Sequence, residues 1–162
     1  MGDIEIKKIV GLNNKKENKQ LFRLTSKDNE IYIKLDKIYL PFNYQKYGGN
    51  LYVNAEILKK DENKLSIINL FEKQVSEQMK YDINDKKFIS VIKNRKDRYH
   101  VKLMLKRYDK KILIDTNDDF NIHNLKEYHK LNYIYDIIIK PEIVWMNEDS
   151  YGIIYYLMKI IN

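Results

Sequence analysis

Apolar and polar residues alternate with a period of two over most of this 162-residue chain, and this pattern constrains its fold more than any other feature. Ile31, Ile33 and Leu35, for example, alternate with Tyr32 and Lys34. Successive side chains of a strand point to opposite faces, so the alternation predicts a half-buried β-sheet. Strands are expected at 4–10, 20–26, 30–40, 50–58, 88–92, 98–108, 110–115, 133–139, 141–146 and 151–160.

One long segment follows the helical period instead. Its apolar positions recur at intervals of three and four residues: Leu65, Ile68, Phe71, Val75 and Met79. Asn63 precedes them as a candidate cap, and a short helix is expected at 123–131. Strands do not alternate with helices, which argues against a parallel doubly wound sheet. We expect a mainly β chain: a single OB-like domain spanning 1–162, an antiparallel β-barrel with one main inserted helix at about 64–80 and small additional helical turns.

The chain contains no cysteine, which removes disulfides and thiolate chemistry and fits a reducing intracellular compartment. No segment approaches the roughly 20 continuous apolar residues of a membrane span. We therefore expect a soluble intracellular protein without membrane association.

Positive charge is concentrated in one part of the chain. Residues 86–111 contain eleven Lys or Arg and two Asp, a net charge of +9, whereas the whole chain carries +7. Three of the four arginines lie between positions 95 and 107, which a lysine-rich composition does not explain. A basic stretch of this kind indicates a polyanionic partner.

The segment 98–108 predicts how this charge is presented. As a strand it places Val101, Leu103 and Leu105 on the core side. The other side then carries Arg98, His100, Lys102, Met104, Lys106 and Tyr108. Alternate side chains of a strand lie about 7 Å apart, close to the reach of one nucleotide in an extended single strand. Successive lysines can therefore each meet a phosphate.

Aromatic residues are interleaved with the basic ones. The segment NYQKYGGN at 43–50 predicts a loop, because Gly48 and Gly49 can adopt positive φ, and a loop leaves aromatic side chains accessible. A charged groove with stacking side chains suits single-stranded nucleic acid. The predicted contacts are Phe42, Tyr44, Tyr47, Lys93, Arg95, Lys96, Arg98, Tyr99, Lys102, Lys106, Arg107, Tyr108 and Lys110.

The sequence gives less support for a catalytic site or a metal site. His123 and His129 are six residues apart in a predicted helix and face different ways. The acidic turn DTNDDF lacks the glycine and distal glutamate of an EF-hand loop. A nuclease site would need Asp36, Glu56 and Lys59 to hold Mg²⁺, and these residues do not have the spacing of the common nuclease motif. We expect no enzymatic activity, no metal and no cofactor.

Several motifs follow one another in a characteristic order between residues 30 and 162. They are Pro41-Phe42, the basic strand Lys102–Arg107, Trp145, and Tyr151-Gly152-Ile153. This order resembles the OB-fold single-stranded DNA-binding proteins of phages and large DNA viruses. The resemblance implies a protein that coats single strands without sequence preference in viral-type DNA replication and recombination.

The same resemblance implies that the basic strand and the Phe42 region contact DNA, while Trp145 and Gly152 close the domain. The chain departs from the family after Asp149, where it has no acidic residues of the kind that recruit replication proteins. Recruitment of replication partners by that route is therefore in doubt.

Alternatives remain open on the sequence alone. An RNA-binding accessory protein is one, because discrimination against RNA depends on contacts to the 2′-hydroxyl. A structural or assembly protein whose basic strand docks an acidic protein partner is another, and a homodimer is compatible with either. We expect single-stranded DNA as the partner, at the site of DNA replication in the host cell if the protein is viral.

Overall fold

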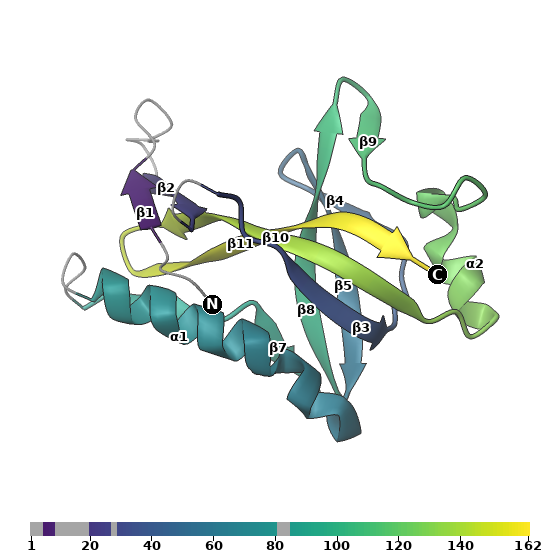
Figure 1. The fold of residues 1–162 in the computed structure, drawn as a ribbon, viewed down its shortest axis with the longest axis horizontal. Coiled ribbons are helices and arrows are strands. Elements are labelled where there is room, and N and C mark those ends of the chain that lie inside the picture. The colour runs from purple at the N-terminus through teal and green to yellow at the C-terminus, as the bar shows by residue number, and fades with distance from the viewer. Residues whose placement is uncertain (1–4, 9–19, 27–28, 81–84) are drawn as a thin grey trace. The chain divides into compact units, whose positions relative to one another are not determined.

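The computed structural model describes residues 5–8, 20–26, 29–80 and 85–162, with only the backbone described for 5–8 (Figure 1). The strand predicted at 4–10 is described as Glu5–Lys8, and its remaining positions lie outside the described residues. The chain forms two compact units. The first comprises Met1–Ile31, Leu65–Val91 and Pro141–Ile154, and the second comprises Tyr32–Lys64, Ile92–Lys140 and Tyr155–Asn162.

The first unit contains the main helix. Its strands are β1 (Glu5–Lys8), β2 (Gln20–Thr25), β6 (Lys87–Ile89) and parts of the long strands β10 (Tyr135–Met146) and β11 (Ser150–Ile161). β2 pairs antiparallel with β1 and β10, and β6 pairs parallel with β11. The apolar stripe predicted for the helix is buried at all five positions.

The main helix, α1, spans Ser66–Met79, close to the predicted range. Asn63 is not its capping residue, contrary to expectation: Leu65 occupies that position with helical dihedral angles and no capping side-chain hydrogen bond. The chain enters α1 from a 3₁₀ helix, η1 (Lys59–Leu65). A side-chain cap requires an extended residue before the first turn, and the preceding 3₁₀ turn removes it.

A tight glycine contact holds the end of the β10–β11 hairpin in the first unit. A Cβ at Gly152 would lie 2.8 Å from Trp145 Nε1 and 2.9 Å from the carbonyl oxygen of Ile89, so a larger residue does not fit. A tight turn joins the two strands, with the Asn147 N–H donating to the Ser150 carbonyl over 2.9 Å.

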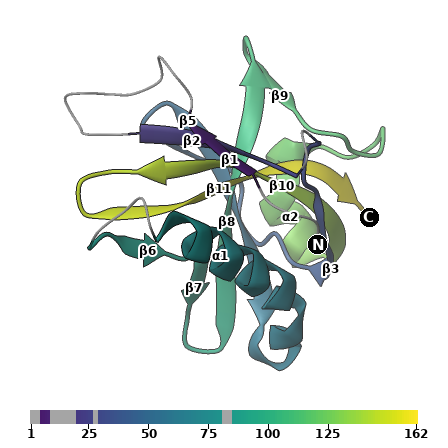
Figure 2. The same ribbon diagram turned by 60° about the vertical axis from the view of Figure 1, so that its left-hand side comes forward.

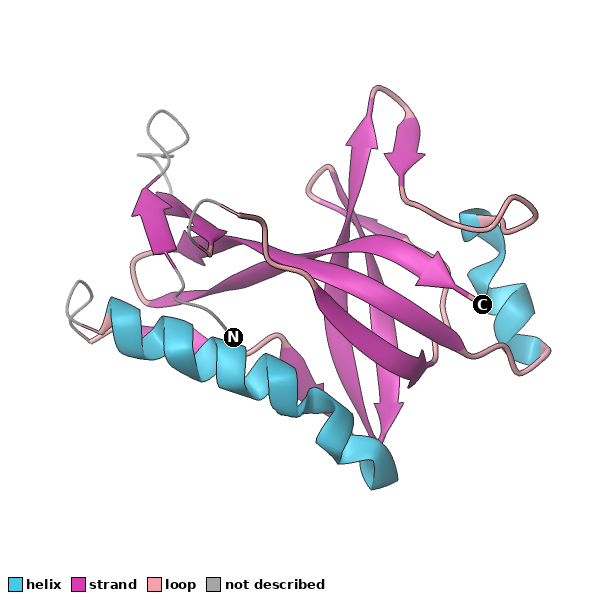
Figure 3. Ribbon diagram, in the orientation of Figure 1, coloured by secondary structure: helices cyan, strands magenta, loops and turns pink. Residues whose placement is uncertain are grey.

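The second unit is a set of strands with short helical turns (Figures 2 and 3). Its complete strands are β3 (Ile33–Ile38), β4 (Gln45–Tyr47), β5 (Asn50–Leu58), β7 (Ile92–Asn94), β8 (Arg98–Tyr108) and β9 (Lys111–Leu113). Its helical turns include η2 (Ile122–Asn124) and α2 (Leu125–Lys130). β3 pairs antiparallel with β10.

β5 and β8 form the centre of the second unit. They pair antiparallel over eight residues, from Leu51 opposite Leu105 to Leu58 opposite Arg98. The alternation predicted for both strands is confirmed, because the side chains on one face are almost completely buried: Leu51, Val53, Ala55, Ile57, Val101, Leu103 and Leu105. The other face of the same two strands is therefore available for function.

The chain is mainly β with one main helix, as predicted (Figure 3). The strand pairing does not close into a barrel among the described residues, since β1 and β4 end the pairing order. The sheet is also mixed: β11 pairs in parallel with β6 and with β8, the latter through Tyr156 and Met104 alone. The expectation of an entirely antiparallel sheet was wrong in this respect, because the alternation specifies faces and not strand directions.

Candidate nucleic-acid interface

One face of the second unit combines lysines with aromatic rings. It is formed by outward side chains of β4, β5, β8 and β11, which the pairing of these strands brings together. We call it the lysine–tyrosine face and define it by Tyr47, Tyr52, Lys102, Met104, Lys106 and Tyr156. Its lysines belong to the row predicted from the sequence, whereas Tyr47 alone of its three tyrosines was among the predicted contacts.

The two lysines of this face lie over tyrosine rings. Lys102 Nζ is 4.5 Å from the ring centroid of Tyr52 and 5.8 Å from that of Tyr47. Lys106 Nζ is 4.9 Å from the ring centroid of Tyr156. A cation over an aromatic face gains about 0.5–1 kcal/mol at an exposed site. These contacts hold both ammonium groups beside aromatic surface.

Met104 lies between the two lysines and completes the face. It is opposite Tyr52 on β5 and opposite Tyr156 on β11. A hollow of about 300 Å³ is lined here by residues of β5, β8, β9 and β11. Its lining contains Lys106 and Arg107 and no acidic side chain. The surface is thus apolar and basic at once.

The other end of β8 differs in its electrostatics. Glu56 of β5 is buried, accepts a hydrogen bond from Arg98 Nη1 at 2.8 Å, and lies 3.3 Å from His100 Nε2. Asp97 accepts from Arg98 Nε at 3.0 Å. The hydrogen bond from Arg98 lowers the pKa of Asp97, and the bonds to Asp97 and Glu56 raise the pKa of Arg98.

Arg98 and His100 were both predicted on the outward side of β8, and Arg98 also as a nucleic-acid contact. Their outward direction is confirmed, but both are half-buried and contact a carboxylate of this chain. The charge of Arg98 is therefore compensated within the protein. A positive charge that is already paired contributes less to binding a polyanion.

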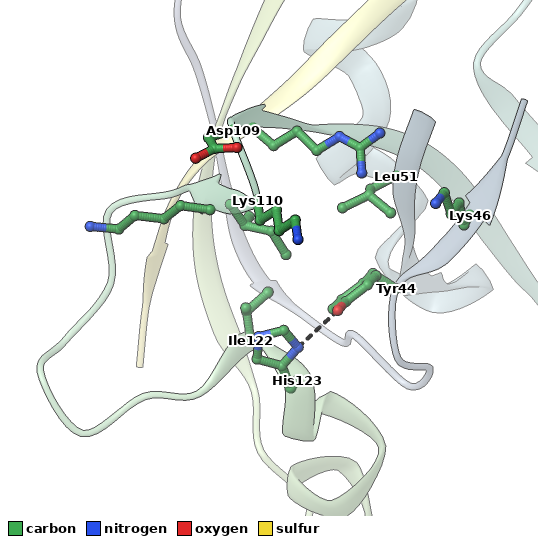
Figure 4. A pocket seen from close by; sticks show the side chains of 10 residues that line it. Tyr44, Lys46, Leu51, Asp109, Lys110, Ile122 and His123 are labelled. Carbon is green, nitrogen blue, oxygen red and sulfur yellow. Dashed lines mark hydrogen bonds between the residues drawn. The ribbon is translucent and has the colours of Figure 1, made fainter. Parts of the chain in front are cut away.

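The aromatic residues predicted around the Gly-Gly loop take three different positions. Tyr47 on β4 is 74% exposed. Phe42 is exposed and makes an edge contact with the His100 ring at 6.3 Å. Tyr44 is instead half-buried, and its hydroxyl hydrogen-bonds His123 Nδ1 at 2.8 Å (Figure 4). The positive φ predicted for Gly48 and Gly49 is confirmed, at 56° and 85°.

Three further predicted contacts lie near the β8–β9 turn. Tyr108 is exposed on the outward side of β8. Arg107 alternates to the opposite side and donates from Nη2 to the Gly49 carbonyl at 2.6 Å. Lys110 is exposed in the turn and lines a second cavity with Arg107. These residues are close in sequence, but the structure divides them between two faces.

Tyr99 also lies on the core side of β8. It is half-buried, and Lys59 Nζ lies 4.0 Å from its ring centroid. Its ring is therefore engaged by this chain and does not belong to the lysine–tyrosine face.

The predicted strand at 88–92 is divided. Residues 87–89 form β6, which pairs with β11, whereas β7 pairs with β8 through a tight loop (Figure 2). Lys93 of β7 is opposite His100, and Arg95 and Lys96 are exposed in the loop itself. These three cations lie at the Arg98 end of β8.

Two tyrosines of the face were not among the predicted contacts. The sequence could have indicated Tyr52, because alternation in β5 places its side chain on the other face of the strand from the buried Leu51 and Val53. Its hydroxyl donates to Gln45 Oε1 of β4 at 2.5 Å. Tyr156 joins the face through a parallel pairing that no local pattern in the sequence indicates.

The residues considered for a nuclease site are engaged elsewhere. Glu56 contacts Arg98, Asp36 pairs with Lys34 at 3.6 Å, and Lys59 donates to Asn94. Within the described ranges, no group of three or more His, Cys, Asp or Glu side chains could hold a metal ion.

Comparison with known proteins gives this chain no family: no family model matches it, and none of the curated proteins does. Among the described helices, none is both long and apolar enough to cross a membrane. The functional argument therefore depends on the geometry of the face itself.

Proposed function

We propose that this protein binds single-stranded DNA through the lysine–tyrosine face, without sequence preference and without catalysing a reaction. The observation that carries the proposal is the placement of Lys102 and Lys106 over tyrosine rings on one face. Aromatic platforms stack bases, and cations beside them neutralise the backbone of the same strand.

The spacing of the two lysines supports an extended strand as the ligand. Lys102 and Lys106 are four residues apart on β8, which corresponds to about 13 Å. That separation suits phosphates two nucleotides apart, with Met104 and the flanking tyrosines beneath the bases between them. A duplex keeps its bases stacked inside and would leave the tyrosine rings unused.

The finer architecture belongs to the same proposal. We infer an OB-like arrangement of the sheet, because OB-folds are five-stranded, partly open barrels that bind nucleic acid on a sheet face. An open sheet with its ligand face on the central strands is compatible with that plan. A role in DNA replication or recombination, with replication proteins as partners, follows from the resemblance of the motif order and is proposed on that ground.

The test is fluorescence anisotropy with labelled single-stranded DNA, single-stranded RNA and duplex DNA of about 20 nucleotides, titrated across a salt series. Preference for single strands is expected, with log K falling by about 0.7 per neutralised phosphate for each unit of log salt. Tyrosine emission should be quenched on binding. Equal, weak binding to all three polymers would instead favour an acidic protein partner, and preference for RNA over DNA would reassign the ligand.

A further inference from the structure

A second cavity lies on the other side of the β8–β9 hairpin. Its volume is about 810 Å³, within the range of small-molecule sites. All its lining residues belong to the second unit: Tyr44, Lys46, Leu51, Arg107, Asp109, Lys110, Lys111, Ile112, Ile122 and His123. None of them is one of the six residues that define the lysine–tyrosine face, and two of them, Leu51 and Arg107, also line the hollow beside it.

The rim of this cavity is strongly basic. Lys46, Arg107, Lys110 and Lys111 contribute four positive charges against the single carboxylate of Asp109. Figure 4 shows Lys46 and Lys110 on opposite sides of the cavity, with Leu51 between them. In the part of the chain that the structure describes, no ion pair occupies either amine. Two such groups across a small space suit a ligand with several negative oxygens.

The floor and one wall are apolar or aromatic. Leu51 and Ile122 are buried, at 7% and 8% exposure, and Tyr44 forms the wall with His123 (Figure 4). The Tyr44 and His123 rings meet edge to face at 5.3 Å between centroids. This surface can pack against a nucleobase or sugar, which a purely phosphate-binding site would not need.

The Tyr44–His123 wall is held from both sides. The Asn121 side chain accepts from the His123 N–H at 2.9 Å and thereby caps η2. The Asn43 side chain accepts from the Lys126 N–H at 3.0 Å, which ties the residue before Tyr44 to α2. A wall fixed by these bonds is formed before any ligand arrives, which lowers the entropic cost of binding.

We infer that this cavity is a second ligand site, which binds a nucleoside 5′-phosphate with its phosphates between Lys46 and Lys110 and its base or sugar on Tyr44, Leu51 and Ile122. The ligand is a free nucleotide or the 5′-phosphorylated end of a strand, since both present the same groups. The inference does not depend on the proposed function.

The test is isothermal titration of the full chain with dATP, deoxyadenosine and inorganic triphosphate. Binding of dATP is expected, with deoxyadenosine at least about 100-fold weaker because it lacks the phosphates. The double variant Lys46→Gln/Lys110→Gln should weaken dATP binding at least about 10-fold. Its control is Lys60→Gln/Lys96→Gln, which removes the same charge from exposed positions that do not line the cavity and should leave dATP affinity unchanged.

A second comparison separates the two ligand sources. Tighter binding of a 5′-phosphorylated strand than of its 5′-hydroxyl counterpart, lost in Lys46→Gln/Lys110→Gln, would assign the strand end. Binding of dATP without that preference would assign the free nucleotide. The inference is overturned if neither is seen at about 1 mM ligand, or if dATP affinity is the same in both double variants. Strand binding that is lost in Lys102→Gln/Lys106→Gln while dATP binding persists would show that the two sites are separate.

Discussion

The two ends of β8 carry the same kind of charge in different surroundings. At one end, Lys102 and Lys106 lie over tyrosine rings, and the hollow beside them has no acidic lining residue. At the other, Arg98 is bonded to Glu56 and Asp97. The basic segment that is continuous in sequence is therefore divided into an end where Arg98 is paired with carboxylates and an end where lysines lie over tyrosine rings.

This contrast shows that net charge alone does not define a binding surface. A cation with a carboxylate partner must give up that bond, or share it, before it neutralises a phosphate. A cation over an aromatic ring brings a stacking surface with it. We therefore expect affinity for single strands to depend mainly on the Lys102–Lys106 end.

The largest effect is expected from reversing charge at the Lys102–Lys106 end of β8. At about 0.1 M salt, each phosphate contact contributes about 5-fold in affinity, from the slope of roughly 0.7 for single strands. Lys102→Glu/Lys106→Glu should therefore lower affinity about 100-fold, since repulsion adds to two lost contacts. The measurement is anisotropy with labelled single-stranded DNA.

The matched control reverses the same amount of charge at the other end. Lys93→Glu/Lys96→Glu should weaken binding by less than about 10-fold. Equal losses for the two double variants would show that binding follows net charge, and the distinction between the two ends would then be wrong. Both variants should fold, because all four lysines are outside the buried core. Only Lys102→Glu/Lys106→Glu should melt a few degrees lower, because it loses the contacts of the two ammonium groups with tyrosine rings.

The next effect concerns the aromatic platform. Tyr47→Leu should lower affinity for single strands about 10-fold, because one stacked base contributes about 1–3 kcal/mol. Tyr99→Leu is the comparison: its ring lies on the core side of β8 beneath Lys59, so we expect lower stability with unchanged affinity. Anisotropy and thermal melting on both variants check this. Loss of affinity in the Tyr99 variant alone would place the strand on the opposite face.

The sequence predicts which side chains of β8 face the core and which face outward, because apolar and polar residues alternate along the strand. The burial of Val101 and Leu103 and the exposure of Lys102 follow from the period of two, because strand geometry fixes which side each residue faces. The buried apolar stripe from Leu65 to Met79 follows from the helical period for the same reason. Local geometry is sufficient in both cases.

The predictions about which residues form the face were incomplete, because these depend on contacts between segments that are distant in sequence. Arg98 is neutralised by Glu56, forty-two positions earlier, and only the register of β5 against β8 brings them together. Tyr156 reaches the face through one parallel pairing, and Tyr44 turns to His123 across seventy-nine positions. No periodicity in a single segment encodes such pairings, so the composition of the face required the structure.

A smaller effect is expected from removing one carboxylate partner of Arg98. Glu56→Gln removes the buried carboxylate that contacts Arg98 and His100, which should lower the melting temperature. Affinity for single strands should rise by less than about 5-fold, because Arg98 keeps its bonds to Asp97. The matched control is Glu72→Gln in the first unit. Glu72 is also buried and accepts hydrogen bonds from Ser90 and the Val91 N–H, so its loss should destabilise without raising affinity. Unchanged affinity in the Glu56 variant would mean that Arg98 is outside the path of the strand.

The smallest effect is the pH dependence of the Asp97–Arg98 pair. Hydrogen bonding from Arg98 lowers the pKa of Asp97 below its ordinary value of 3.8, so the bond stabilises the folded state above that value and is lost as pH falls through the lowered pKa. Asp97→Asn should therefore melt a few degrees below the unsubstituted protein at neutral pH, and the difference should disappear in strong acid. Asp97 is largely exposed, so salt should also reduce the difference. Asp118→Asn, in an exposed turn, should show no such trend, and a difference for Asp97→Asn that persists in acid would mean that its side chain stabilises the β7–β8 loop without ionisation.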